Sequence, residues 1–488
     1  MEGNAFDPSS LLENYQLSSN MIKPIEGGSL SLQCGLAYAC PTIAVSFLIG
    51  PIALLQGIYA KYFGLSLGTI AAVILIARLF DAVTDPLVGY FSDRYFHRTG
   101  SRKLFITLGG LLLVFSSYFL YVPFGFDTRD APFQVSGEYF LTWFLAFYLG
   151  YTLFETPHLA WGGEIVTSSK EKNKIYSLRA LTVSTGLMLF FSVPLLPFFD
   201  SSEFTPRTLA WSVLFSIILM LPLLYYCINN VPDGESKNNN NHHLSRSKKF
   251  HLRELFRIAR GNKSFLIFIA ALFFAGAGTG MWFGMMFLFV DVYLRLGHSL
   301  SLVYLLSYGA SIILITFWYA IANRFGKKTS WSSGMLMVAI GILGTGFLSP
   351  GGAGWISLLV CMILINGGIM ATVLLAPSLL ADIIDYSLWK YDQDYAATYF
   401  SIYALTTKAN LAIGGAFGLA IAGYYGFEPT ASTQSERALD GMRLSVAWLP
   451  SFLTMVSIMF IKQIPMNIHR HNIIRRRLDL RAKSRVII

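Results

Sequence analysis

The fold of this chain is read most directly from residues 66–92, SLGTIAAVILIARLFDAVTDPLVGYFS. A helix needs about 20 mainly apolar residues to cross the roughly 30 Å hydrocarbon core of a bilayer. Backbone amides in lipid must pair within their own helix, so a run of this kind is predicted to be helical throughout. The same run carries Arg78, Asp81 and Asp85. Ionisable groups are costly inside hydrocarbon, which indicates that these three belong to a functional site.

Eleven further apolar runs of similar length surround this one, so the sequence predicts an all-α polytopic membrane protein with twelve transmembrane helices. Their expected limits are 34–60, 66–92, 104–124, 138–166, 177–199, 208–229, 264–291, 299–322, 330–349, 355–385, 397–426 and 442–463. The composition favours the same class, because 54% of the 488 residues are hydrophobic and only 13% are charged. Soluble domains are about one-quarter charged. A water-soluble enzyme is therefore excluded.

One long polar stretch divides the chain into two six-helix halves. We expect an N-terminal segment at 1–30, the halves at 31–230 and 264–463, a linker at 231–263 and a basic tail at 464–488. Most Lys and Arg residues fall in the two termini, the linker and the loops on the same side, so both termini are predicted to be cytoplasmic. A plasma membrane or bacterial inner membrane is expected. The net charge of +10 then reflects topology, and no nucleic-acid partner is expected.

The charged residues of the second predicted helix share one face. Arg78, Asp81 and Asp85 are spaced by three and four residues, which places each one turn from the next. One acid would suffice to neutralise Arg78, so the second acid favours a functional role. The structural alternative is a buried charge network that locks helix packing, and for Arg78 the two interpretations are equally supported.

The fourth predicted helix brings a third carboxylate, Glu155, to a comparable depth. The hydroxyls of Thr84 and Thr152 add further oxygen atoms to this region. Oxygen ligands of this kind suit a small cation, and neighbouring carboxylates equally suit a proton relay. No cofactor is expected beyond a coupling ion, Na⁺ or H⁺, and no other metal site.

Two basic residues lie near these acids in the predicted bundle. Lys408, in the middle of the eleventh helix, is interpreted either as a counter-ion to the acids or as a donor to a bound solute. Arg179 lies about one turn inside the cytoplasmic end of the fifth helix, where its side chain either extends to the interface or contacts the substrate or a gate. Near the opposite surface, Asp291 and Arg295 have the i,i+4 spacing of an ion pair.

Charged residues also gather at the cytoplasmic ends of helices, where we expect them to form salt bridges when that side is closed. This predicted cytoplasmic gate consists of Asp93, Arg94, Arg102, Glu164, Asp382 and Asp385. The turns that carry basic residues follow the second helix of each half, and an acid follows a proline in the fourth helix of each half. Internal duplication is therefore suspected.

The strings RLFDAVTDPLVGYFSDR (78–94) and RTGSR (98–102) closely resemble the signature of the glycoside–pentoside–hexuronide:cation symporter family. This branch of the major facilitator superfamily includes melibiose permease and, more distantly, eukaryotic sodium-coupled lysolipid transporters. The resemblance continues through ETP (155–157) and LADIIDY (380–386) and spans nearly the whole chain. It implies two pseudo-symmetric six-helix halves with the site between them near the membrane midplane.

The resemblance also implies roles for individual residues. Cation binding in melibiose-permease-like members maps to Asp81, Asp85 and Thr152, with Thr84 as a further candidate. The acid, arginine and lysine that are associated with sugar binding map to Glu155, Arg179 and Lys408.

Two departures from the sugar carriers concern the substrate. Those carriers have a sugar-contacting acid in their first helix, whereas residues 36–54 contain none. They also have a stacking tryptophan one turn after the helix-4 acid, where this chain has Leu159, and Trp161 lies on a different face. The site is therefore expected to be more apolar than that of a sugar carrier.

The sequence predicts a secondary active transporter, a cation-coupled symporter of a small organic solute that works by alternating access. Its expected partners are that solute, the coupling cation and membrane lipid, and the chain is expected to be monomeric. One alternative keeps the fold and makes the cargo a lysolipid or another amphiphile. A second alternative is a non-transporting receptor or scaffold, which would not need the carboxylate stripe. An enzyme is not expected, because no nucleophile–base or metal constellation is found.

Overall fold

A computed structural model describes residues 31–123, 134–165, 169–233, 261–350, 354–391, 396–431 and 433–466, with a few positions between 470 and 480. The predicted N-terminal segment 1–30, nearly all of the linker and most of the basic tail lie outside the described residues. Within the described part the chain is helical, with short 3₁₀ and π segments.

The first half of the chain supplies six of the membrane-length passes. Its elements are α2 (Leu32–Ala39), α3 (Pro41–Ile49), α4 (Ile52–Tyr62), α5 (Leu67–Thr99), α6 (Lys103–Tyr121), α7 (Gly137–Ile165), α8 (Ser169–Ser192), η1 (Val193–Leu195) and α9 (Pro206–Asn230). The pieces α2, α3 and α4 form one pass, which is interrupted at Pro41 and Pro51. Proline is tolerated in the first turn of a helix because its missing N–H has no intrahelical partner there.

The second half repeats this arrangement. Its elements are α11 (Lys263–Phe287), η2 (Leu288–Tyr293), α12 (Gly297–Phe325), α13 (Lys327–Thr345), α14 (Trp355–Tyr391), α15 (Ala396–Tyr424), α16 (Glu436–Arg443), η3 (Leu444–Trp448) and α17 (Leu449–Gln463). The segments η2 and η3 are π-helical and continue the passes that α11 and α17 form.

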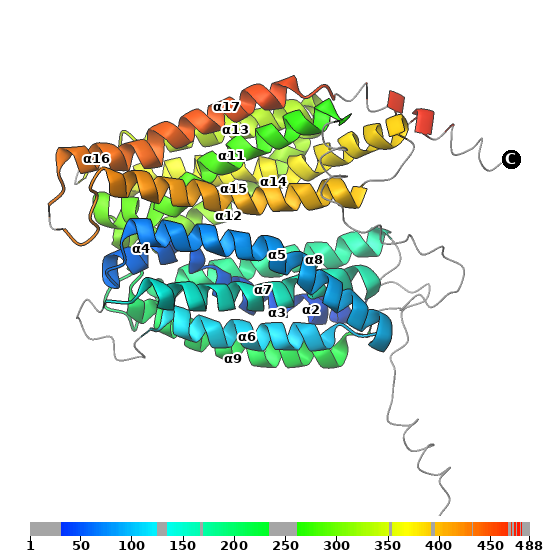
Figure 1. Cartoon of the computed structure of the whole chain (residues 1–488), viewed down its shortest axis with the longest axis horizontal. Helices are drawn as coiled ribbons and strands as arrows, with labels where there is room; N and C mark the ends of the chain where they lie inside the picture. Colours follow the sequence, from blue (N-terminus) through cyan, green and yellow to red (C-terminus); the bar gives the residue numbers. More distant parts are fainter. Residues whose placement is uncertain are drawn as a thin grey trace, which may run out of the picture.

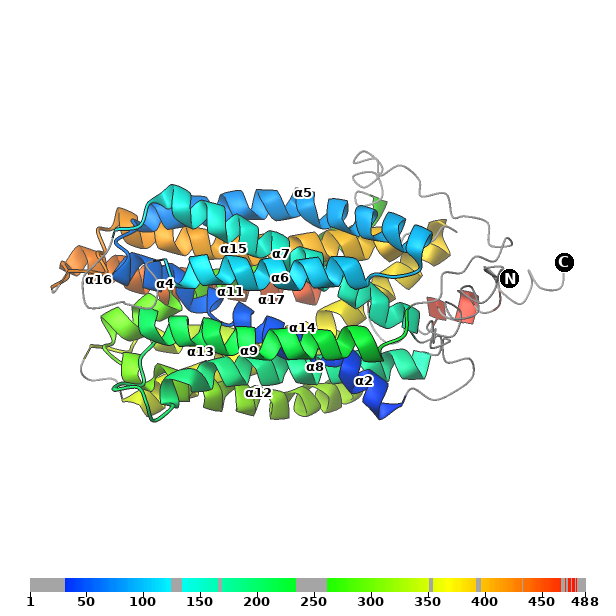
Figure 2. The same ribbon diagram turned by 90° about the horizontal axis from the view of Figure 1, so that it is seen from below.

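The helices lie side by side along the long axis of the molecule (Figures 1 and 2). Figure 1 shows α2–α9 in one bundle and α11–α17 in the other. Ten of the described helical passes are long and apolar enough to cross a membrane. The remaining two, α7 and α13, run alongside them and pack against α6 and α14. Polar residues interrupt the apolar residues of α7 along its length, and α13 begins with two lysines followed by threonine and serines, so both helices are less apolar.

Several helices extend beyond the ends that apolarity alone predicts. The second pass, expected to end at residue 92, continues as α5 to Thr99, where Gly100 adopts a left-handed backbone (φ 75°) that ends the helix. The tenth pass continues as α14 to Tyr391 rather than ending at 385. Charged residues mark where a helix leaves the hydrocarbon, but they are good helix formers and do not end it.

Within the described residues the two bundles meet chiefly where α5 packs against α15, α4 against α11 and α8 against α12. We call the end that carries the α5–α6 and α12–α13 turns the inner end, and the opposite end, with α16 and η2, the outer end. The inner end is the predicted cytoplasmic side.

Candidate cation and solute site

Three charged residues of α5, Arg78, Asp81 and Asp85, lie in the middle third of this helix, and the first two form one cluster with α7. Arg78 Nη1 lies 2.8 Å from Asp81 Oδ2, and Nη2 donates to the Tyr148 hydroxyl at 2.6 Å. The guanidinium carbon also lies 4.5 Å from the centre of the Tyr148 ring. Asp81 is 4% exposed, so burial of its negative charge would be costly without the arginine partner.

Asp85, one turn farther along α5, belongs to a different cluster that joins the two halves. Its Oδ1 accepts a hydrogen bond of 2.9 Å from Thr152 Oγ1 of α7. Its Oδ2 forms an ion pair with Lys408 Nζ of α15, on the opposite bundle. The three residues lie near the midpoints of their helices. The site therefore lies between the halves and far from either end.

Of the four predicted cation ligands, the structure joins Asp85 and Thr152 by a direct hydrogen bond. The second carboxylate oxygen of Asp81, Oδ1, is buried and has no hydrogen-bond partner in the described part of the chain. This oxygen and the Asp85–Thr152 pair present the kind of donors that a small hard cation binds. Thr84 differs, because its hydroxyl donates to the Phe80 carbonyl of its own helix at 3.0 Å. No hydrogen bond links Thr84 to the Asp85 cluster within the described residues.

Glu155, one turn beyond Thr152 on α7, pairs with Arg179 Nη2 of α8 within the first half. Both side chains are partly buried, at 24% and 14% exposure, so the arginine is engaged inside the bundle and does not extend to the interface. His158 lies next to this pair on α7 and is fully buried, with its ring stacked on Tyr38 at 4.3 Å. Its Nε2 lies 2.9 Å from the Tyr38 carbonyl oxygen, and its Nδ1 is buried with no hydrogen-bond partner in the described residues.

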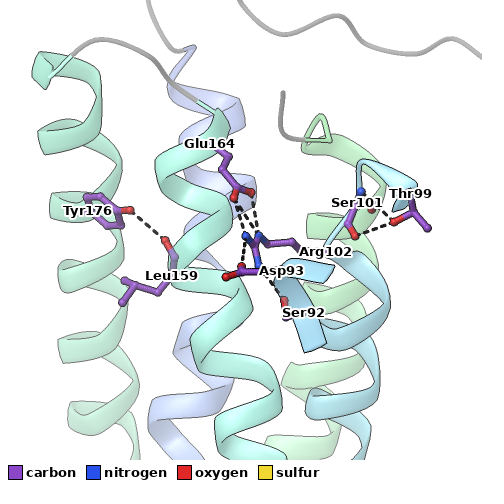
Figure 3. Close-up of polar contacts among 8 residues, drawn as sticks. All are labelled: Ser92, Asp93, Thr99, Ser101, Arg102, Leu159, Glu164 and Tyr176. Carbon is purple, nitrogen blue, oxygen red and sulfur yellow. Dashed lines mark hydrogen bonds and ion pairs between the residues drawn. The ribbon is translucent and has the colours of Figure 1, made fainter. Parts of the chain in front are cut away.

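At the inner end of the first half, Arg102 is the centre of a charge network (Figure 3). Its Nη2 lies 2.7 Å from Asp93 Oδ1 and 2.7 Å from Glu164 Oε1, and its Nε donates to both oxygens of Glu164. Its Nη1 donates to Ser92 Oγ at 2.8 Å. The network ties α5 and α7 to the turn that precedes α6. Arg94, in contrast, is exposed and forms no ion pair in the described part.

The second half has a corresponding contact at its inner end. Lys327 Nζ lies 2.7 Å from Asp382 Oδ1 and donates to the Ser378 carbonyl at 3.1 Å, which ties the α12–α13 turn to α14. Asp385 lies one turn farther along α14 and is partly buried. Each of these contacts holds elements of one half together. Their opening and closing as a gate remains a prediction.

The outer end contains a contact that the sequence did not indicate. Asp291, in η2, pairs with Lys61 Nζ of α4 at 2.6 Å, so the bridge joins the two halves. The predicted pair with Arg295 is wrong. The helix ends at Tyr293, and Arg295 has a left-handed backbone (φ 59°). Arg295 therefore does not lie one helical turn from Asp291 on the same face.

Two functional candidates were missed from the sequence, and one of them had a signal. Tyr148 stands four residues before Thr152 and seven before Glu155, so the i, i+4, i+7 spacing on α7 places all three on one face. Lys61 had no such signal, because its partner is 230 residues away in the chain. Only the packing of α4 against α11, which η2 continues, brings the two together.

Two helical bundles with charged residues meeting between them at mid-helix define a membrane carrier. The chain belongs to the MFS/sugar transport protein family, whose model matches residues 31–467. Its relatives are transporters and not enzymes.

The relatives are distant in sequence, and several of them cover most of the chain. The uncharacterized symporter YnaJ of Bacillus subtilis is 22% identical over 97% of both chains. The isoprimeverose transporter of Lactiplantibacillus pentosus is 23% identical over 91% of this chain and 90% of its own. The putative glycoside/cation symporter YagG of Escherichia coli is 30% identical over a shorter part, 29% of this chain and 30% of its own.

Solved structures show the same fold. A mutant of the nucleoside transporter NupG superposes with a TM-score of 0.66 at 13% identity, covering 89% of this chain and all of its own. A D-xylose-proton symporter superposes with a TM-score of 0.63 at 14% identity over 89% of this chain and 96% of its own.

Proposed function

We propose that this protein couples the transport of a small organic solute to that of Na⁺ or H⁺. The observation that carries the proposal is the ion pair between Lys408 and Asp85. A lysine ammonium is a compact monovalent cation on a flexible stem. It therefore provides the positive charge that a coupling ion would supply at the same carboxylate, and it can withdraw when that ion arrives.

The groups around Asp85 support an ion site that Lys408 fills when no ion is bound. Asp85 has two carboxylate oxygens, Thr152 has a hydroxyl oxygen, and Asp81 has a buried oxygen with no partner in the described residues. Arg78 compensates the charge of Asp81, so a single additional positive charge balances the cluster. Either Lys408 or one monovalent cation provides it.

This exchange couples the ion to the solute. A cation at Asp85 releases Lys408, whose ammonium then has donors available for a solute between the halves. Glu155 and Arg179 supply an acceptor and donors on the other half. Ion binding thus reduces the free energy needed to separate Lys408 from Asp85 during solute binding, which is positive cooperativity between the two ligands. Cooperativity of this sign favours symport.

We propose a hydroxyl-rich, sugar-like solute. Charged donors and an acceptor at one site suit the hydroxyl groups of such a molecule. Two relatives are named for the transport of isoprimeverose and for glycoside/cation symport, which supports the same class. A lysolipid or another amphiphile is the second candidate, because the helix-1 acid and the stacking tryptophan of sugar carriers are missing here.

The exchange predicts opposite effects for the two partners of the ion pair. In Lys408→Ala, the competitor for Asp85 is gone, so Na⁺ should stabilise the purified protein against heat at a lower concentration than it does in the wild type. Solute affinity should fall in the same variant. In Asp85→Asn, stabilisation by Na⁺ should disappear. Choline chloride at equal ionic strength is the control for screening.

Thr407→Ala is the matched variant, because Thr407 adjoins Lys408 on α15 and its hydroxyl donates to carbonyls of its own helix. It should behave as the wild type. If Na⁺ stabilises none of the proteins, the same comparison is made by lowering the pH, so that H⁺ is the ion tested. An unchanged ion response in both Lys408→Ala and Asp85→Asn would contradict the exchange.

The solute class is tested by transport into proteoliposomes. We expect uptake of labelled glycosides and pentosides that grows with an inward Na⁺ or H⁺ gradient. Uptake of lysophosphatidylcholine without uptake of any sugar would replace the sugar-like class by the amphiphile class. A protein that binds a solute but shows no counterflow would be a receptor, and the transport proposal would fail.

A further inference from the structure

A cavity of about 660 Å³ lies at the inner end of the second half, between α12, α13 and α14. The polar and charged residues that line it include Asn323, Lys327, Lys328 and Asp382. It is distinct from the candidate transport site, because Asp85 lies on α5 of the other half near the middle of that helix. The cavity is formed around the turn between α12 and α13.

The charges of this cavity are not balanced. Lys327 is paired with Asp382 and also donates to the Ser378 carbonyl. Lys328 donates to the Ile464 carbonyl at 3.0 Å and has no carboxylate partner among the described residues. An ammonium group has three N–H donors, so two donors of Lys328 remain available. The lining groups therefore carry an excess of one positive charge.

A second positive group lies beside the cavity. Arg324 is exposed, and its guanidinium carbon lies 5.3 Å from the ring centre of Phe325, which lines the cavity. Phe325 and Tyr319 are 58% and 62% exposed. Exposed aromatic rings beside basic residues at the end of a transmembrane helix are typical of the membrane–water interface.

Much of the remaining lining is apolar. Leu374, Leu375 and Leu379 of α14 line it, as does Met466 after α17. The ligand that matches this lining has a negatively charged group next to Lys328 and an apolar portion against the leucines. A soluble anion would leave the apolar portion unused, whereas a lipid of the surrounding leaflet satisfies both.

We propose that this cavity binds an anionic phospholipid, with its phosphate near Lys328 and Arg324 and the beginning of its acyl chains along α12 and α14. Basic pockets between transmembrane helices on the cytoplasmic side are suited to anionic headgroups. The bound lipid would hold the α12–α13 turn against α14. This inference does not depend on which solute is transported or which ion is coupled.

The test compares lipids on the purified full-length protein. Thermal unfolding is followed in detergent with added phosphatidylglycerol or phosphatidylcholine of the same acyl chains, and lipid adducts are counted by native mass spectrometry. We expect phosphatidylglycerol to raise the midpoint of unfolding more than phosphatidylcholine does. The double variant Arg324→Gln/Lys328→Gln should lose more than half of this difference.

Lys462→Gln is the matched control, because Lys462 is an exposed lysine at the inner end of α17 that does not line the cavity. It should retain the full response to phosphatidylglycerol. Equal responses of the wild type and the double variant would overturn the site. If soluble glycerol 3-phosphate at the same concentration gave the same stabilisation as phosphatidylglycerol, the occupant would be a free phosphate and the lipid proposal would fail.

The double variant removes two positive charges, so a defect in folding must be separated from a loss of lipid binding. Arg324→Lys/Lys328→Arg keeps both charges and should retain the preference for phosphatidylglycerol. A charge-conserving variant that folds but has lost the preference would also contradict the proposal, because the headgroup contact is argued from charge.

Discussion

At the scale of single residues, neighbouring charges on one helix have different surroundings. Asp81 has its own arginine and is almost fully buried, whereas Asp85 is partly exposed and depends on a lysine from the other half. The arginine partner of Asp81 is on the same helix and stays beside it, whereas the lysine partner of Asp85 is on the other half and can leave, as the proposed exchange requires. This difference is the reason to centre the exchange on Asp85.

Arg102 gives a residue-scale prediction at the inner end. Its guanidinium contacts Asp93, Glu164 and Ser92 at once, which a lysine ammonium cannot do with the same geometry. Arg102→Lys should therefore destabilise the protein by about 1–3 kcal/mol, measured by thermal unfolding in detergent. Arg94→Lys is the control, since Arg94 is exposed and has no ion pair in the described part. Equal stability of the two variants would show that the network contributes nothing.

At the scale of elements, the position of Lys408 depends on how closely α15 approaches α11. Glycines permit this approach, because a Cβ atom on Gly280 would lie 2.4 Å from the Leu411 carbonyl oxygen of α15. Gly414, from the other side, is equally close to the Ala277 carbonyl oxygen of α11. The clashing atoms belong to the backbone and cannot turn aside as a flexible side chain could.

We therefore predict that Gly280→Ala pushes α15 away from α11. Overpacking of this kind costs about 1–3 kcal/mol, which should appear as a lower midpoint of thermal unfolding. Lys408 would move relative to Asp85, so the concentration of Na⁺ or H⁺ needed for half-maximal stabilisation should also change. Gly309→Ala is the matched control, because a Cβ atom at Gly309 meets nothing within 4 Å. If Gly280→Ala unfolded at the same temperature as the wild type, the two helices would separate at no cost in stability and the prediction would be wrong.

At the scale of the whole molecule, the outer ends of the two halves are joined by several contacts. Lys61 pairs with Asp291, and Ser202 Oγ donates to the His298 carbonyl at 2.6 Å. The rings of Phe191 and Tyr304 stack at 4.2 Å across the same boundary between α8 and α12. In the alternating-access mechanism proposed for this protein, an outward opening would break these contacts, so they oppose the outward-facing state.

We predict that Lys61→Ala increases this population, because it leaves the carboxylate of Asp291, only 5% exposed, without its partner. Ser301, which is fully buried at the outer end, is the reporter position. In a Ser301→Cys background, a membrane-impermeant maleimide added from outside should react several-fold faster in Lys61→Ala. The exchange variant Lys61→Asp/Asp291→Lys should restore slow labelling. Fast labelling in the exchange variant would show that the bridge does not hold the outer end closed.

Much of the fold follows from residue chemistry that is local in the chain. Continuous apolar runs of bilayer length are expected to become helices, because an α-helix pairs nearly all of their amides within the segment itself. The three-and-four spacing of Arg78, Asp81 and Asp85 is likewise local and predicts that the three charges share one face of a single helix. The ends of α5 and α14 were placed too early, since loss of apolarity marks the membrane surface and not the end of a helix.

The partners of these charges were decided only by tertiary packing. Lys408 and Asp85 are 323 residues apart, and Lys61 and Asp291 are 230 apart. Periodicity relates residues within one helix, but it carries no information about which helices of two separate halves face each other or at what depth. Asp291 shows this most clearly, because the helix ended before the expected partner and the docking of α4 supplied another one.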